Sequence, residues 1–143
     1  MQLITVFDSN VYVAAALKPG GYADIWLDIA ALPGSGLRLF TSTAILNEVR
    51  RKLTKRLALP EPEVDHFIKR LKQIAVVVKP ARKIRAVEED PDDNVILECA
   101  LAAKAQLIIT ADSHLLKLNP YKGIGVAHPK ELKNIFAGDA KNS

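Results

Sequence analysis

Two kinds of segment alternate along the 143-residue chain. Short apolar runs rich in β-branched residues predict buried strands, and they lie at 3–7, 37–41, 74–78 and 106–110, with a fifth, short edge strand expected at 123–127. Between these runs, apolar residues recur every three or four positions, which is typical of helices that pack on a sheet. The alternation predicts an α/β fold, a three-layer α/β/α domain with a central parallel sheet of four to five strands.

Composition agrees with one compact domain, because 49% of the residues are hydrophobic and 25% are charged. We expect one domain over residues 1–136 and a polar C-terminal tail over 137–143. No apolar run approaches the ~18–20 residues that cross a bilayer, and the first residues lack the basic segment of a signal peptide. With Cys99 as the single cysteine, we expect a protein of the reducing cytoplasm, without a disulfide framework.

Charged residues are gathered in two segments, although the net charge of +4 is only mildly basic. The basic segment holds Arg50, Arg51, Lys52, Lys55 and Arg56, and the acidic one holds Glu88, Glu89, Asp90, Asp92 and Asp93. A run of charges is usually solvated surface. The acidic run calls for more, because like charges that close together repel one another unless something neutralises them.

Four acidic residues fall where the predicted strands end. Asp8 directly follows the first strand, and Asp112 lies just past the fourth. Asp93 lies in the first turn of the helix after the third strand, and Glu48 lies less than two turns into the helix after the second. Because the crevice of a parallel α/β sheet lies outside the carboxyl ends of its strands, these four carboxylates are expected to meet there.

Such a cluster has a chemical consequence, since several neighbouring carboxylates cannot all stay ionised unless a cation binds or a pKa rises. Oxygen ligands suit hard cations such as Mg²⁺ or Mn²⁺. An ion held this way polarises a phosphodiester and activates a water molecule. The four acids therefore predict hydrolysis of a nucleic acid or another phosphate ester.

Three of these four residues also have a simpler interpretation, while Asp8 is harder to explain otherwise because it ends a buried strand. Asp93 is typical of a helix N-terminus, Glu48 is spaced to pair with Lys52, and Asp112 suits a turn. Their convergence on one edge favours the site. Polar neighbours are expected to orient the acids, Ser9 and Asn10 beside Asp8, Thr110 beside Asp112, and Asp92 beside Asp93. His114 lies near Asp112 in the sequence, but surface packing is the expectation for it.

These residues carry a resemblance to the PIN-domain family, in particular to the VapC-like toxins of prokaryotic toxin–antitoxin systems. The first strand ends in Asp8-Ser9-Asn10, the second acid lies in Asn47-Glu48-Val49, and an acidic helix start follows at Asp90-Pro91-Asp92-Asp93-Asn94. Thr110-Ala111-Asp112 closes the set, with alanine where the family has glycine. The similarity covers the chain up to about Phe136, so the resemblance implies a PIN-like nuclease domain over residues 1–136.

The resemblance implies an endoribonuclease that depends on Mg²⁺ or Mn²⁺, with Asp8, Glu48, Asp93 and Asp112 as catalytic residues and metal ligands. It also implies a protein that is often a homodimer and often inhibited by a cognate antitoxin. The helical segments 22–32 and 62–73 offer faces for such pairing. The basic residues expected to contact RNA phosphates are Arg50, Arg51, Lys55 and Arg56. Some PIN domains act in RNA processing, so the toxin role is one of two nuclease alternatives.

Two further classes of protein share an α/β architecture. A receiver domain of signalling proteins needs paired acids after the first strand and a phosphoacceptor after the third, and neither is found in this chain, whose third strand ends in Val78-Lys79-Pro80. A non-catalytic binding module on the same fold stays open, because a fold does not fix a function.

Overall fold

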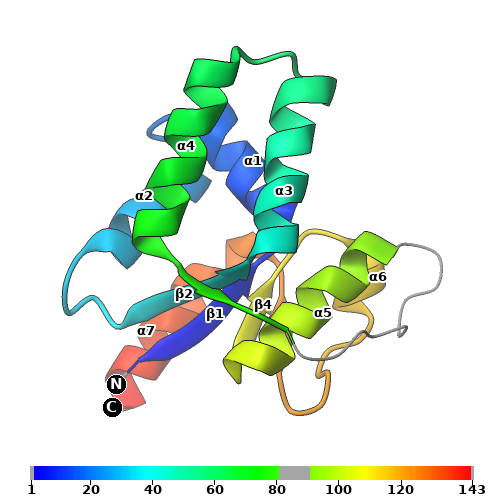
Figure 1. The fold of residues 1–143 in the computed structure, drawn as a ribbon. Helices are drawn as coiled ribbons and strands as arrows, with labels where there is room; N and C mark the ends of the chain where they lie inside the picture. The colour runs from blue at the N-terminus through cyan, green and yellow to red at the C-terminus, as the bar shows by residue number, and fades with distance from the viewer. Residues whose placement is uncertain (1, 81–90, 143) are drawn as a thin grey trace.

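The computed structural model describes residues 2–80 and 91–142, with the side chains of 2–80 and 93–137. Within these residues one parallel sheet has the strand order β3-β2-β1-β4-β5 (Figure 1). The strands are β1 (Leu3–Phe7), β2 (Leu37–Ser42), β3 (Val76–Val78), β4 (Leu107–Ile109) and β5 (Gly125–Ala127). The predicted α/β class and the parallel sheet are confirmed, and the fifth strand lies at an edge, with three residues like β3 and β4.

Helices connect the strands in the order that the sequence pattern predicts. They are α1 (Ser9–Leu17), α2 (Tyr22–Ala31), α3 (Thr43–Arg51), α4 (Glu61–Ile74), α5 (Pro91–Ala103), α6 (Ser113–Leu116) and α7 (Leu132–Asn142). Two short helices complete the set, η1 (Lys52–Arg56) and η2 (Pro129–Glu131). The helix α7 continues to Asn142, so residues 137–142, expected as a polar tail, are helical. None of the described helices is long and apolar enough to span a membrane.

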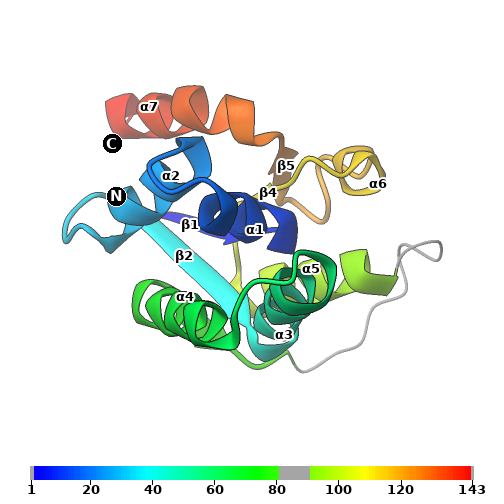
Figure 2. The same ribbon diagram turned by 90° about the horizontal axis from the view of Figure 1, so that it is seen from above.

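The sheet is buried because helices pack on both of its sides. Helix α5 contacts β1, β2, β3 and β4, and in Figure 1 it lies on the other side of the sheet from α1 and α4. Its residues Ile96, Leu97 and Cys99 are fully buried, and burial raises the pKa of the Cys99 thiol to about 12. Figure 2 shows α7 alongside α2, where the rings of Phe136 and Trp26 lie 5.7 Å apart.

One helix departs from the predicted pattern. Apolar spacing predicts that the helix after β2 buries Leu53 and Leu57, and Leu53 is buried while Leu57 is 41% exposed. The helix widens at η1 into a π-helix, in which the Leu57 N–H donates to the carbonyl of Lys52 at 3.2 Å, five residues back. Because this turn holds more residues than an α-helical turn, it rotates Leu57 away from the core.

Candidate functional site

The strand ends are joined at the carboxyl edge by the residues that follow β1 and β4. The Asp8 N–H donates to the carbonyl of Ile109 at 2.9 Å. The hydroxyl of Thr110 donates to Asp8 Oδ2 at 2.7 Å and accepts the N–H of Asp112 at 3.0 Å. Ser9 Oγ donates to Asp8 Oδ1 at 3.4 Å. Asp8, Ser9 and Thr110 are buried, so the Asp8 carboxylate is fixed in place between the two central strands.

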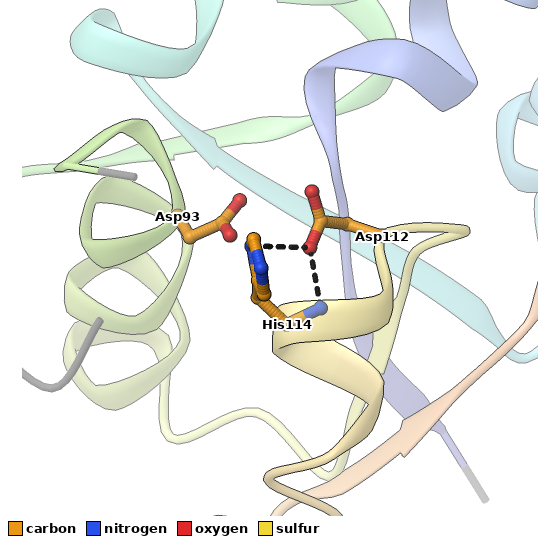
Figure 3. A group of neighbouring side chains, drawn as sticks. All are labelled: Asp93, Asp112 and His114. Atoms are coloured by element: carbon orange, nitrogen blue, oxygen red, sulfur yellow. Dashed lines mark hydrogen bonds and ion pairs between the residues drawn. The ribbon is translucent and has the colours of Figure 1, made fainter. Parts of the chain in front are cut away.

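Asp93 and Asp112 come together at the same edge from different helices. Asp93 is the third residue of α5 and is buried. Asp112 caps α6, since its Oδ1 accepts the N–H groups of His114 at 2.7 Å and of Leu115 at 3.3 Å. One ligand atom each from Asp93, Asp112 and His114 lies within 4.8 Å of the other two. Figure 3 shows the two carboxylates directed toward one another, with the His114 ring between them.

This group of donor atoms fits a divalent cation. Carboxylate oxygens are ligands of Mg²⁺ and Mn²⁺, and a neutral imidazole nitrogen is a ligand of transition metals. The Nδ1 atom of His114 lies 3.7 Å from Asp112 Oδ1, so the ring is next to the carboxylate that would share an ion with it. The residues present can therefore hold a metal ion between α5 and α6.

Glu48 lies at the edge too, but its carboxylate has a partner from its own segment. It is buried, and its Oε1 lies 3.0 Å from Lys52 Nζ. The same ammonium donates to Ser9 Oγ at 2.8 Å and to Asn10 Oδ1 at 2.9 Å. The pairing of Glu48 with Lys52 that the sequence spacing allows is present, and it is buried instead of solvated.

The structure thus divides the four predicted acids. Asp93 and Asp112 face one another, Asp8 is linked to Asp112 through the Thr110 hydroxyl, and Glu48 is bound to Lys52. Thr110 donates to Asp8, not to the carboxylate of Asp112 that it was expected to orient, and Asn10 accepts from Lys52. The side chain of Asp92 and all of Glu88, Glu89 and Asp90 lie outside the described residues.

Sequence reasoning gave too little weight to two residues of this region. His114, expected as surface packing, belongs to the group of donor atoms. Lys52, counted with a basic segment, is buried at the base of α1. Each lies at a helical or turn spacing from an acid that was identified, two residues after Asp112 and four after Glu48, and that spacing was the available signal.

The basic residues expected to contact RNA lie on the α3–η1 segment. Arg50 donates to Asp65 of α4 at the surface. Arg51, Lys55 and Arg56 are exposed. Their contact with phosphates stays a prediction, and of this group Lys55 and Arg56 are well placed to test it.

The protein is an α/β protein in which buried acidic residues gather at the carboxyl edge of a parallel sheet. Residues 5–114 match the family model described as PIN domain. The chain therefore belongs to the PIN-domain family, a family of nucleases. The family resemblance predicted from the sequence is confirmed.

Individual proteins are similar to the chain over most of its length. The uncharacterized protein MJ1680 of Methanocaldococcus jannaschii is 29% identical over 138 residues, which cover 91% of this chain and 86% of that protein. VapBC2 from Rickettsia felis, bound to a DNA fragment from its promoter, has a TM-score of 0.65 and 15% identity, covering 88% of this chain and 98% of that one. PAE2754 from Pyrobaculum aerophilum has a TM-score of 0.63 and 17% identity, covering 95% and 90%. At these identities the solved structures show a shared fold.

Proposed function

We propose that this PIN domain is a divalent-metal-dependent endoribonuclease and the toxin of a toxin–antitoxin pair. The observation that carries the proposal is the convergence of donor atoms from Asp93, Asp112 and His114 at the edge where Asp8 is fixed. Membership of a nuclease family supports it. Asp8, Glu48, Asp93 and Asp112 form the acidic site, and Mg²⁺ or Mn²⁺ is the cofactor that fits it.

The division of labour within this site follows from the contacts. A bound divalent ion supplies charge stabilisation for the phosphodiester and a more acidic water molecule. The residues of the chain would hold that ion and position the substrate relative to it. Asp93 and Asp112 present oxygens from two helices, while the Thr110 hydroxyl fixes Asp8 relative to the backbone of Asp112. Phosphates on either side of the cleaved bond are expected at the exposed Lys55 and Arg56.

The toxin role rests on the surface beside the site. A groove between α1 and α2 begins at Asn10 and Ala111 and has mainly apolar walls. Leu17 and Tyr22 on its walls are 50% and 47% exposed. Exposed apolar residues gathered in one place are typical of a protein interface. The similar Rickettsia felis structure is a VapBC complex, which supports a cognate antitoxin as the partner here. The RNA substrate and a place in the cytoplasm are further parts of the proposal.

Pairing of two copies is the second interaction that we propose. The segment 22–32 forms α2, and its Ile25 is 48% exposed, which supports a role of this face in a homodimer. The segment 62–73 falls within α4. The homodimer stays a prediction.

The test of the nuclease activity compares Asp93→Asn with Asp28→Asn in cleavage of single-stranded RNA with Mn²⁺. We expect Asp93→Asn to lower the rate by about 100-fold or more, because it removes a charged donor from the ion. Asp28 belongs to an ion pair on α2 and α4 and not to this group, so the Asp28→Asn control should cleave at the wild-type rate. Circular dichroism checks that both variants fold.

Wild-type cleavage that persists in Asp93→Asn, with contaminating nuclease removed, would contradict the assigned site. Cleavage that is lost equally in Asp28→Asn would point to a general loss of stability. The antitoxin role is tested separately, by asking whether the product of a small adjacent gene inhibits cleavage.

A further inference from the structure

Lys52 is a buried charge in a segment whose other cations face outward. Its exposed fraction is 8%, and lysine is almost never buried at this level without a partner. An ammonium group carries three N–H donors. The structure provides three acceptors, Glu48 Oε1, Ser9 Oγ and Asn10 Oδ1, all at 2.8 to 3.0 Å. All three N–H donors of Lys52 therefore have acceptors within the protein. Unlike the exposed Lys55, Lys52 is not available to bind a phosphate of the substrate.

The backbone explains how Lys52 reaches this position. Its N–H donates to the carbonyl of Glu48, as in an α-helix, so its side chain lies on the same helix face as the carboxylate four residues before it, and the π-helix η1 begins at this residue. The Thr54 hydroxyl donates to the carbonyl of Arg50 at 2.8 Å within the same turn. With Lys52 directed inward, the exposed Arg51 and Lys55 remain on the surface on either side of it.

The contacts of Lys52 lead directly into the acidic site. Ser9 Oγ accepts from the Lys52 ammonium and lies 3.4 Å from Asp8 Oδ1, to which it donates. Lys52 is thus linked to Asp8 through one hydroxyl and to Glu48 directly. A divalent ion at Glu48 Oε1 would compete with a buried ammonium, and displacing that ammonium would leave Ser9 Oγ and Asn10 Oδ1 without their donor, which is costly.

We propose that Lys52 is a positioning residue that takes the place of a metal ion in the Asp8–Glu48 half of the site. Glu48 is then the counter-ion of Lys52 instead of a metal ligand, and the protein binds one divalent ion, at Asp93, Asp112 and His114. This inference rests on the proposed nuclease function and refines its metal site.

The test counts Mn²⁺ ions bound to the full chain by isothermal titration calorimetry. Wild type should bind one ion. Glu48→Gln should still bind one, with an affinity within about threefold of wild type, whereas Asp112→Asn should lose about tenfold or more, the range found when a metal site loses a partner. Glutamine keeps an oxygen that accepts from Lys52, so this variant changes the charge and little else.

The sharpest variant is Lys52→Met, because it releases Glu48 from its counter-ion. We expect it to bind a second Mn²⁺ ion, and the double variant Glu48→Gln/Lys52→Met to return to one. A general loss of structure would not create a binding site. Lys55→Met, which removes an exposed lysine three residues further on, is the matched control and should bind one ion as wild type does.

Three results would overturn the inference. They are a wild type that binds two ions, a Glu48→Gln variant that loses tenfold or more in Mn²⁺ affinity, and a folded Lys52→Met variant that still binds only one. If Lys52→Met does not fold, the Glu48→Gln result decides. An assay of RNA cleavage by the wild type in the same buffer distinguishes the two proposals. If the wild type cleaves RNA but gives one of these three results, only the role of Lys52 is contradicted. If it binds no Mn²⁺ and cleaves no RNA, the nuclease function is contradicted as well.

Discussion

Within the described residues, two groups of acidic side chains have contrasting surroundings. On α2, Asp24 and Asp28 lie against Arg70 of α4, whose guanidinium donates to Asp24 Oδ1 at 2.6 Å and to Asp28 Oδ1 at 2.7 Å. At the carboxyl edge of the sheet, Asp93 and Asp112 face one another across the ring of His114 (Figure 3). The acids on α2 are paired with a cationic side chain of the protein, Arg70, whereas the acids at the sheet edge present ligand atoms that converge on one point.

The difference separates acids that hold the fold together from acids that can bind an ion. The N–H of Gly20, and with it the guanidinium of Arg70, lowers the pKa of Asp24. That carboxylate is fully satisfied and ties the start of α2 to α4. The Glu48–Lys52 pair combines both features, since it lies at the functional edge but has its own cation. Whether an acid is functional therefore depends on which charge the fold places beside it.

Adding a metal ion should produce the largest effect that separates the two groups. A divalent ion that binds only the folded protein stabilises it by about 2.7 kcal/mol when its free concentration is 100-fold above Kd, which raises Tm by several degrees for a domain of this size. We expect this shift in wild type and in Arg70→Met, and little of it in Asp93→Asn. Melting curves with and without Mn²⁺ measure it, and equal shifts in all three proteins would remove the distinction.

Without a metal ion, the larger effects on the free energy of unfolding are expected from the acids that are paired with Arg70. Asp24→Asn removes a charge that accepts from a backbone N–H and from Arg70, and we expect a loss of about 2 kcal/mol at pH 7. Asp28→Asn is the matched control on the same guanidinium. Its side chain is 68% exposed, so solvent screens the pair and the loss should be about 0.5 kcal/mol. Urea unfolding of the two variants gives the comparison, and equal losses would contradict it.

The stability difference between wild type and Asp24→Asn should also depend on pH, in a direction that follows from the pKa of Asp24. Because the pKa of Asp24 is lower in the folded protein than the value of about 3.9 in an unfolded chain, ionised Asp24 stabilises the fold above that value. This stabilisation is lost as the pH falls through the folded pKa. The stability difference between wild type and Asp24→Asn should therefore be constant from pH 5 to 7 and shrink below about pH 4. A difference that grows on acidification would rule out this role.

The smallest expected effect concerns the basic segment beside the site. Lys55→Gln/Arg56→Gln should weaken RNA binding modestly and flatten its salt dependence, with the slope of log K against log salt falling by about 1.4 for two phosphate contacts on a single strand. Lys130→Gln/Lys133→Gln, at two exposed lysines of η2 and α7, removes the same charge and provides the control for net charge. An unchanged slope in the double variant would assign Lys55 and Arg56 to another role.

The sequence by itself determined the strands, their parallel arrangement and the edge at which the acids lie. Runs such as 3–7 and 107–109 are apolar on both faces, which suits only a sheet covered by helices. Since parallel strands end at a common edge, residues that follow them, such as Asp8 and Asp112, had to lie there. Apolar periodicity and chain direction were sufficient for this part.

The tertiary structure decided which of these side chains touch one another. Periodicity cannot show that Thr110 serves Asp8, because they are far apart in the sequence and meet only when β1 pairs with β4. Nor can it show that a π-helix at η1 leaves Leu57 exposed. An α-helical repeat assumes one rotation per residue, and a single wide turn changes that rotation. The spacing of four residues already pairs Glu48 with Lys52, whereas the contacts of the Lys52 ammonium with Ser9 and Asn10, more than forty residues away, could be found only in the folded chain.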